Sequence, residues 1–110
     1  MCCLRFINNL GSGFSEIVHK DAIEYEFKKL NIPFQREKEY SVSYKDIILK
    51  HKFYADFVVF DKIILEIKSV ENIYDKNIAQ CLNYLKVSDC KLAITANFYK
   101  DLLDHKRIIL

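Results

Sequence analysis

Apolar residues in the segment 14–30 recur at the three- and four-residue spacing of an amphipathic helix. Pro33 cannot continue a helix, so we expect this one to end near Leu30 or Asn31. The apolar residues predicted to share one face of the helix are Phe14, Ile17, Val18, Ile23, Phe27 and Leu30.

Downstream, the pattern changes to the two-residue period of a strand. Apolar and polar residues alternate through 39–44, which predicts a strand with one buried face and a hairpin tip at Lys45-Asp46. The segments 51–60 and 62–68 are apolar on both faces, with Asp61-Lys62 as the turn between them. Such segments are typical of central strands covered by helices. The three segments together predict a three-strand meander.

The helical period returns after Val70. Asn72 or Asp75 can cap a helix that continues to about Lys86. The apolar stripe of this helix consists of Ile78, Leu82 and Leu85.

The remaining segments complete a mixed fold. The segment 91–98 is predicted to be a buried strand that joins the sheet through a crossover. A short helix at 101–104 and a strand at 107–110 follow. The fold class is therefore α/β (α+β), in one domain spanning residues 1–110, with the order helix, three-strand meander, helix, strand, short helix, strand.

Composition narrows the class of protein. The chain has 110 residues, of which 51% are hydrophobic and 29% are charged. This composition is typical of one globular domain and excludes a disordered chain. No apolar run approaches the length of a membrane span, and the N-terminus does not resemble a signal peptide, so we expect a cytoplasmic protein without membrane contact. The cysteines form no C-x-x-C pair and the histidines lie far apart, which favours free thiols over a zinc site.

Net charge leaves nucleic acid open as a partner. The chain carries 17 basic and 15 acidic side chains, a balance of +2 that predicts no strongly basic field over the whole domain. Any nucleic-acid binding must therefore come from a local arrangement or from a bound metal.

Three charged residues interrupt the apolar central strands. Glu66 and Lys68 are two apart on one strand, so their side chains project to the same face, and Asp56 interrupts the neighbouring strand. Charges in a half-buried sheet cost several kcal/mol unless they are paired or bound to metal. The alternative to a functional site is a simple Glu66–Lys68 ion pair on an exposed strand face.

These residues suit a magnesium site. Asp56 and Glu66 supply hard oxygen ligands for Mg²⁺, and the backbone carbonyl of Ile67 is a further candidate ligand. Lys68 is placed to orient or help deprotonate a metal-bound water, or to stabilise charge on a phosphate. Mn²⁺ is the alternative ion.

Strand register provides a test of this site. A two-residue turn at Asp61-Lys62 would pair Asp56 with Ile67 and turn Asp56 away from Glu66. The site therefore requires a one-residue shift, through a three-residue loop or a bulge near positions 57–63.

Three helical residues are further candidates. Gln80 and Tyr84 are four apart on the second helix, hence neighbours able to contact a phosphate or the attacking water, or else ordinary helix flank. Glu16 lies in the first turn of the first helix, where an acidic side chain also stabilises the helix dipole.

At this point the residues show a family resemblance. The runs GFSEIVH, YADFVVFDKIILEIKSV, AQCLNYLK and ANF resemble the GxxExxY proteins of the PD-(D/E)XK nuclease superfamily over nearly the whole chain. The resemblance implies a restriction-endonuclease-like fold and a nuclease-type site. By analogy, Asp56, Glu66 and Lys68 match the D…ExK signature, Glu16 the helix glutamate, and Gln80 and Tyr84 the Q-x-x-x-Y of the next helix.

The chain also differs from the family pattern. His19 stands where the motif has Tyr, and Ala55 stands where the superfamily label has Pro. The helix before the Gly11–Gly13 turn is shortened to residues 1–10, so a homodimer or a partner protein is expected to cover the exposed surface.

The leading hypothesis from the sequence is a Mg²⁺-dependent nuclease that hydrolyses phosphodiester bonds in DNA, with RNA second. The alternative is a catalytically inactive module of the same fold that binds nucleic acid or protein.

Overall fold

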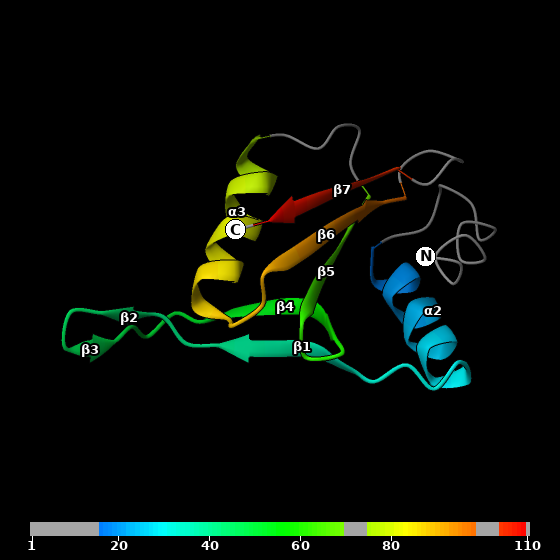
Figure 1. Cartoon of the computed structure of the whole chain (residues 1–110), viewed down its shortest axis with the longest axis horizontal. Coiled ribbons are helices and arrows are strands. Elements are labelled where there is room, and N and C mark those ends of the chain that lie inside the picture. The colour runs from blue at the N-terminus through cyan, green and yellow to red at the C-terminus, as the bar shows by residue number, and fades with distance from the viewer. Residues whose placement is uncertain (1–15, 70–74, 99–103, 110) are drawn as a thin grey trace.

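The computed structural model describes residues 16–69, 75–98 and 104–109. Its centre is a five-stranded mixed sheet, with helices α2 and α3 on either side of it in Figure 1. The strands lie in the order β1 (Phe34–Tyr40), β4 (Phe53–Val59), β5 (Ile63–Lys68), β6 (Leu92–Asn97) and β7 (Asp104–Ile109).

The order of strands confirms the predicted architecture. β1, β4 and β5 form an antiparallel meander, and β6 lies parallel to β5. Helix α3 (Asp75–Val87) lies between β5 and β6 in the chain, as a crossover between parallel strands requires. This arrangement is compatible with a restriction-endonuclease-like fold.

Each helix covers one face of the sheet. Ile23 and Phe27 of α2 (Glu16–Lys29) pack in one hydrophobic cluster with Phe57 of β4. Tyr84 and Leu85 of α3 pack in a second cluster, whose strand residues include Val58, Ile64 and Ala93. Adjacent strand residues point to opposite faces, so the two-sided apolar pattern of β4 and β5 follows from their place between two helices.

The end of α2 is fixed by a hydrogen-bonded cap. Asn31 takes a left-handed conformation with φ of 57°, the N–H of Ile32 donates to the carbonyl of Phe27 at 2.9 Å, and the N–H of Asn31 donates to the carbonyl of Lys28 at 3.2 Å. These two bonds form a Schellman motif, and Pro33 follows it. The helix thus ends where the sequence predicted.

The buried face of α2 differs from the predicted one. His19, Ile23 and Phe27 are buried, whereas Ile17 and Leu30 are 56% and 52% exposed. Positions 19, 23 and 27 are spaced four residues apart, so the buried stripe of the helix runs along the side that carries His19 and not along the side of Ile17 and Leu30. The His19 ring stacks on the Phe98 ring, with the ring centres 4.5 Å apart. Phe14 lies outside the described residues.

The predicted strand at 39–44 is wrong in its bounds. The sheet strand β1 begins earlier, at Phe34, and ends at Tyr40, while Ser43–Tyr44 (β2) pairs with Ile47–Ile48 (β3) in a separate two-stranded hairpin. The alternation continues past Tyr40, but the hairpin extends beyond the sheet (Figure 1), and none of its residues belongs to either hydrophobic cluster of the described chain. The predicted hairpin tip at Lys45-Asp46 is confirmed.

The last strand begins earlier than its apolar residues indicate. β7 starts at Asp104 and pairs only with β6, and such an edge strand tolerates polar residues. Position 104 is therefore not helical, and 101–103 lie outside the described residues, as does the predicted shortened helix at 1–10. Within the described ranges, none of the helices is long and apolar enough to cross a bilayer.

Candidate active site

The connection between β4 and β5 provides the register that the site requires. Val59 pairs with Ile63, so the loop consists of three residues, Phe60 to Lys62, and not of the two predicted at Asp61-Lys62. Phe60 and Asp61 both have φ of 56°, and the N–H of Lys62 donates to the carbonyl of Val59 at 3.1 Å. The one-residue shift is therefore present.

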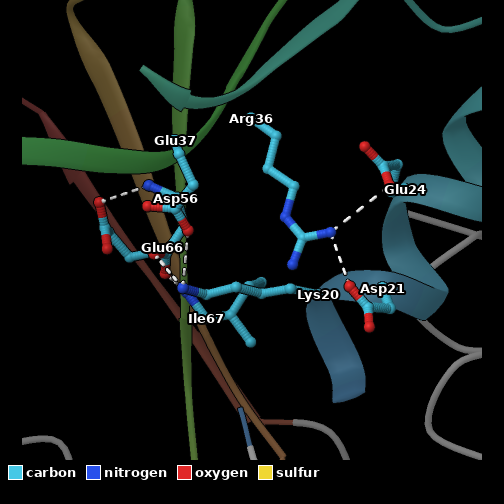
Figure 2. A network of polar contacts seen from close by, with 8 residues as sticks. All are labelled: Lys20, Asp21, Glu24, Arg36, Glu37, Asp56, Glu66 and Ile67. Atoms are coloured by element: carbon cyan, nitrogen blue, oxygen red, sulfur yellow. Dashed lines mark hydrogen bonds and ion pairs between the residues drawn. The ribbon is translucent and has the colours of Figure 1, made fainter. Parts of the chain in front are cut away.

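The shifted register places Asp56 opposite Glu66. The paired positions run from Val59↔Ile63 to Phe57↔Leu65, and the next pair in the same register is Asp56 and Glu66. Here side chains replace the backbone ladder, because Asp56 Oδ2 accepts the N–H of Ile67 at 2.7 Å and Glu66 Oε1 accepts the N–H of Asp56 at 3.4 Å. The two carboxylates thus belong to one hydrogen-bonded unit (Figure 2).

Strand β4 is distorted at Asp56. Ala55 packs in the cluster on the α3 face and Phe57 in the cluster on the α2 face, although residues two apart on a regular strand share a face. On the other side, the β1 pairing passes from Arg36↔Phe57 to Lys38↔Ala55 without a Glu37↔Asp56 pair. The distortion frees the Asp56 carboxylate to lie between the strands.

Burial makes this pair of acids electrostatically costly. Asp56 is 8% exposed and Glu66 is 3% exposed. Burial and the adjacent negative charge of Asp56 raise the pKa of Glu66 to about 9, and the positive charge of Lys68 opposes this shift. A site that raises the pKa of an acid in this way favours a bound cation.

Lys20 of α2 supplies a cation at this place. Its Nζ lies 2.7 Å from Asp56 Oδ1 and 3.1 Å from Glu37 Oε1, and the lysine side chain is only 14% exposed (Figure 2). Burial alone would lower the pKa of Lys20, but the hydrogen bonds and charges of Asp56 and Glu37 raise it above its ordinary value. Glu37 has φ of 54°, an uncommon conformation for a strand residue other than glycine.

Sequence reasoning missed Lys20 and Glu37. Lys20 follows Glu16 by one helical turn, so the i, i+4 rule places the two side chains on the same face of α2. This spacing was the feature of the sequence from which Lys20 could have been predicted as a site residue. Nearby, Arg36 binds Asp21 at 2.7 Å and Glu24 at 3.4 Å and thereby holds β1 against the helix (Figure 2).

Lys68 and Glu16 lie at the far end of β5. Lys68 is half-buried, and its backbone carbonyl accepts the N–H of Phe98 at 2.9 Å. Glu16 Oε2 accepts the N–H of Ser69 at 2.9 Å, which brings the first turn of α2 to the residue after Lys68. The fold therefore gathers Glu16 and the E-x-K residues at one end of the strand.

The two candidates on α3 are in different surroundings. Tyr84 is buried, stacks on Phe53 at 4.4 Å, and has a pKa raised by burial and then by the charges of Glu66 and Asp56. Gln80 is exposed and lines a surface depression of about 440 Å³ along the outer side of the helix. The fold thus brings Tyr84, but not Gln80, near the carboxylates.

The donors present fit a magnesium-type site. Among the described residues, no three His, Cys, Asp or Glu side chains are grouped so that they could hold a metal ion, and the candidate donors are two carboxylates and a backbone carbonyl. Mg²⁺ in proteins is usually bound through one or two carboxylates, with water and substrate phosphate completing the shell. The N–H of Ile67 faces Asp56, and in an antiparallel strand the carbonyl of a residue faces the same neighbour as its N–H.

A mixed sheet between two helices, with two buried acids and a lysine on its central strands, is compatible with a nuclease-like domain of the restriction-endonuclease-like fold. Comparison with known proteins gives the family. The family model of the PD-(D/E)XK nuclease superfamily matches residues 1–108, and the chain belongs to that superfamily. Its nucleases generally use divalent metals. No curated protein and no solved structure matches the chain.

Proposed function

We propose that this chain is a Mg²⁺-dependent nuclease that hydrolyses phosphodiester bonds in DNA, with RNA as the second substrate. The observation that carries the proposal is that hydrogen bonds join Asp56 to Glu66 and Ile67 across two buried strands, with Lys68 two positions beyond Glu66 on the second strand. Membership of a nuclease superfamily supports the same reaction.

In this proposal the metal is held by Asp56, Glu66 and the backbone carbonyl of Ile67. A bound Mg²⁺, or Mn²⁺ in its place, lowers the pKa of a ligated water and polarises the phosphoryl oxygen of the substrate. An ion bound between the two acids would take the place of the proton that the raised pKa keeps on Glu66 at neutral pH.

The remaining residues act on water and phosphate. Lys68 projects from the same face of β5 as Glu66, where it would orient the attacking water and stabilise negative charge that develops on the phosphate. Tyr84, buried within the influence of the Glu66 and Asp56 charges, would donate a hydrogen bond to the phosphate or the attacking water, and Glu16, which accepts the N–H of Ser69, holds the backbone beside Lys68 in place. Gln80 has a role only if substrate extends over the outer side of α3.

Other expectations from the sequence stay as proposals. We place the chain among the GxxExxY proteins, as one domain over residues 1–110, in the cytoplasm, with nucleic acid as its partner and a homodimer or partner protein as a further association.

The proposal is tested by measuring cleavage of labelled single- and double-stranded DNA and RNA in the presence of millimolar Mg²⁺ or Mn²⁺. We expect cleavage by the wild type that is lost with EDTA and reduced at least about 100-fold, the scale of removing a stabilising group, in Asp56→Ala and Lys68→Ala. Equal activity of the wild type and both variants would identify a contaminant and refute the proposal.

One observation favours the alternative, a catalytically inactive binding module of the same fold. Lys20 already neutralises Asp56 without a metal, at 2.7 Å. Titration calorimetry of the wild type with Mg²⁺ and Mn²⁺ distinguishes the two: heat of binding that disappears in Asp56→Asn supports the nuclease, and no binding at millimolar ion supports the inactive module.

A further inference from the structure

Residues 41–52 form an arm that projects from the sheet. β2 and β3 pair through Ser43↔Ile48 and Tyr44↔Ile47, and the N–H of Leu49 donates to the carbonyl of Val42 at 2.8 Å. Figure 1 shows this arm extending away from the sheet, on the side opposite α2. None of its residues belongs to either hydrophobic core cluster of the described chain.

The arm exposes apolar side chains without an internal partner. Tyr44 and Ile47, a directly paired couple that shares one face of the hairpin, are 57% and 60% exposed, and Ile48 is 66% exposed on the opposite face. A two-stranded hairpin is only marginally stable alone in water, and contiguous exposed apolar residues commonly mark a contact surface. The exposed apolar side chains of the arm therefore indicate that it binds a partner.

Charge identifies the chemistry of that partner. The arm holds three lysines, Lys45, Lys50 and Lys52, against one acid, Asp46, so it accounts for the whole net charge of +2 of the chain, and the other residues balance. Lys52 is paired with Glu39 at 3.0 Å, while Lys45 lies with its Nζ 5.5 Å from the centre of the Tyr44 ring. A lysine beside an exposed aromatic ring suits a phosphate next to a sugar or base.

The position of the arm relates it to the candidate active site. β4 begins at Phe53, directly after the arm, and Asp56 lies three residues farther along, which is about 10 Å of strand. From Phe53 to the tip at Lys45-Asp46 the chain can span roughly 23 Å more. The tip therefore lies at most about 33 Å from Asp56, which corresponds to up to about ten base pairs along a duplex.

We propose that this arm binds a nucleic-acid duplex beside the candidate active site, with Lys45 and Lys50 on phosphates and the face that carries Tyr44 and Ile47 against the groove. A two-stranded β-ribbon has the width to enter a major groove, and apolar side chains can also wedge into a minor groove. The inference rests on the proposed function, because it names how that site would hold its substrate.

The test measures binding without cleavage. Fluorescence anisotropy of a labelled 20-base-pair DNA is recorded in EDTA over a range of salt concentrations, for the wild type and for Lys45→Gln/Lys50→Gln. Removing two phosphate contacts lowers the magnitude of the slope of log affinity against log salt by about 1.8 and weakens binding at least about tenfold at 0.1 M salt. The matched control is Lys28→Gln/Lys29→Gln, two exposed lysines at the end of α2 with the same loss of charge, which we expect to change affinity less than about twofold.

A second variant tests the apolar surface. Tyr44→Ser/Ile47→Ser is expected to weaken DNA binding while leaving the melting temperature of the domain nearly unchanged, because neither residue packs in a core. Its oligomeric state is measured by light scattering beside that of the wild type. A wild-type dimer that this variant dissociates, with DNA affinity unchanged, would assign the arm to a second copy of the chain and overturn the inference.

The outcomes separate the inference from the proposed function. If the wild type and both lysine variants bind DNA equally, the arm inference fails while the nuclease proposal stands on its cleavage assay. If the arm variant and the α2 control variant lose affinity equally, DNA binds to basic residues over the whole surface and not to the arm in particular, and the arm inference again fails. If the wild type does not bind the DNA duplex, the arm inference fails, and the cleavage assay with Mg²⁺ or Mn²⁺ decides the proposed function separately.

Discussion

The ion pair between Lys20 and Asp56 gives the sharpest prediction about this fold. The two side chains are 14% and 11% exposed and their charged atoms lie 2.7 Å apart, so the pair is buried. Lys20→Met keeps most of the apolar stem but leaves the Asp56 carboxylate uncompensated next to Glu66. Removing one partner of a buried pair typically costs about 3–5 kcal/mol.

Asp56 retains one source of stabilisation in this variant. Its Oδ2 still accepts the N–H of Ile67 at 2.7 Å, a hydrogen bond to a charged group worth about 1.5–3 kcal/mol. We therefore expect a loss near the lower end, about 3 kcal/mol in the free energy of unfolding at pH 7. The matched control is Lys52→Met, which removes an exposed pair with Glu39 and should therefore cost far less stability than Lys20→Met.

Urea unfolding followed by circular dichroism measures both variants, in EDTA and again in 10 mM Mg²⁺ as the chosen condition. If Asp56 is a metal ligand, the ion should stabilise Lys20→Met more than the wild type, because it replaces the missing cation. Lys20→Met/Asp56→Asn should be more stable than Lys20→Met alone, since it also removes the unpaired charge. A loss in Lys20→Met no larger than that in Lys52→Met would refute the reasoning and show that the Asp56 charge is not buried at a cost.

Three further predictions follow from the same geometry. The pKa of Glu66 is 4.5 in the unfolded chain and about 9 in the folded protein, so between pH 4.5 and pH 9 the folded state binds more protons than the unfolded state. The metal-free protein should therefore lose stability as the pH rises through this range, by up to about 1.4 kcal/mol per pH unit. Denaturant titrations at several pH values should show this slope in the wild type and its disappearance in Glu66→Gln; an unchanged slope contradicts the assignment. Phe60→Gly should raise the free energy of unfolding by about 0.5–1 kcal/mol, because Phe60 is held at φ of 56° in the loop, and a lower melting temperature would count against this. Glu16→Ala should cost about 1 kcal/mol through loss of the hydrogen bond from Ser69, measured by thermal unfolding, with Glu16→Gln as the conservative control that keeps an acceptor.

The central sheet and its helices could be predicted from the sequence because their signals are local. The two-sided apolar strands, the return of the helical period after Val70, and Pro33 each report on burial or backbone geometry within a few residues. Asp56 and Glu66 could also be singled out, since acids within apolar strands are costly wherever the strands lie.

Other features depended on contacts between distant segments. The buried face of α2 was misjudged because Phe98 of the chain beyond β6 selects His19 as its neighbour, which helical spacing alone does not reveal. Lys20 was missed for the same reason: its partners Asp56 and Glu37 lie on β4 and β1. The strand at 39–44 was extended too far because alternation shows where apolar residues fall, not whether a core is there to receive them.

The loop of Phe60 to Lys62 makes chain length part of the active-site signature. Asp56 and Glu66 are ten positions apart, an even number, and directly opposed residues with even separation require a hairpin loop with an odd number of residues. A single insertion or deletion anywhere between them would carry the two acids to opposite faces while leaving every signature residue intact. The parity of this spacing is thus a criterion, beyond residue identity, for deciding which relatives retain the site. Substitutions in the loop should be tolerated, whereas changes in length should be tolerated only in steps of two.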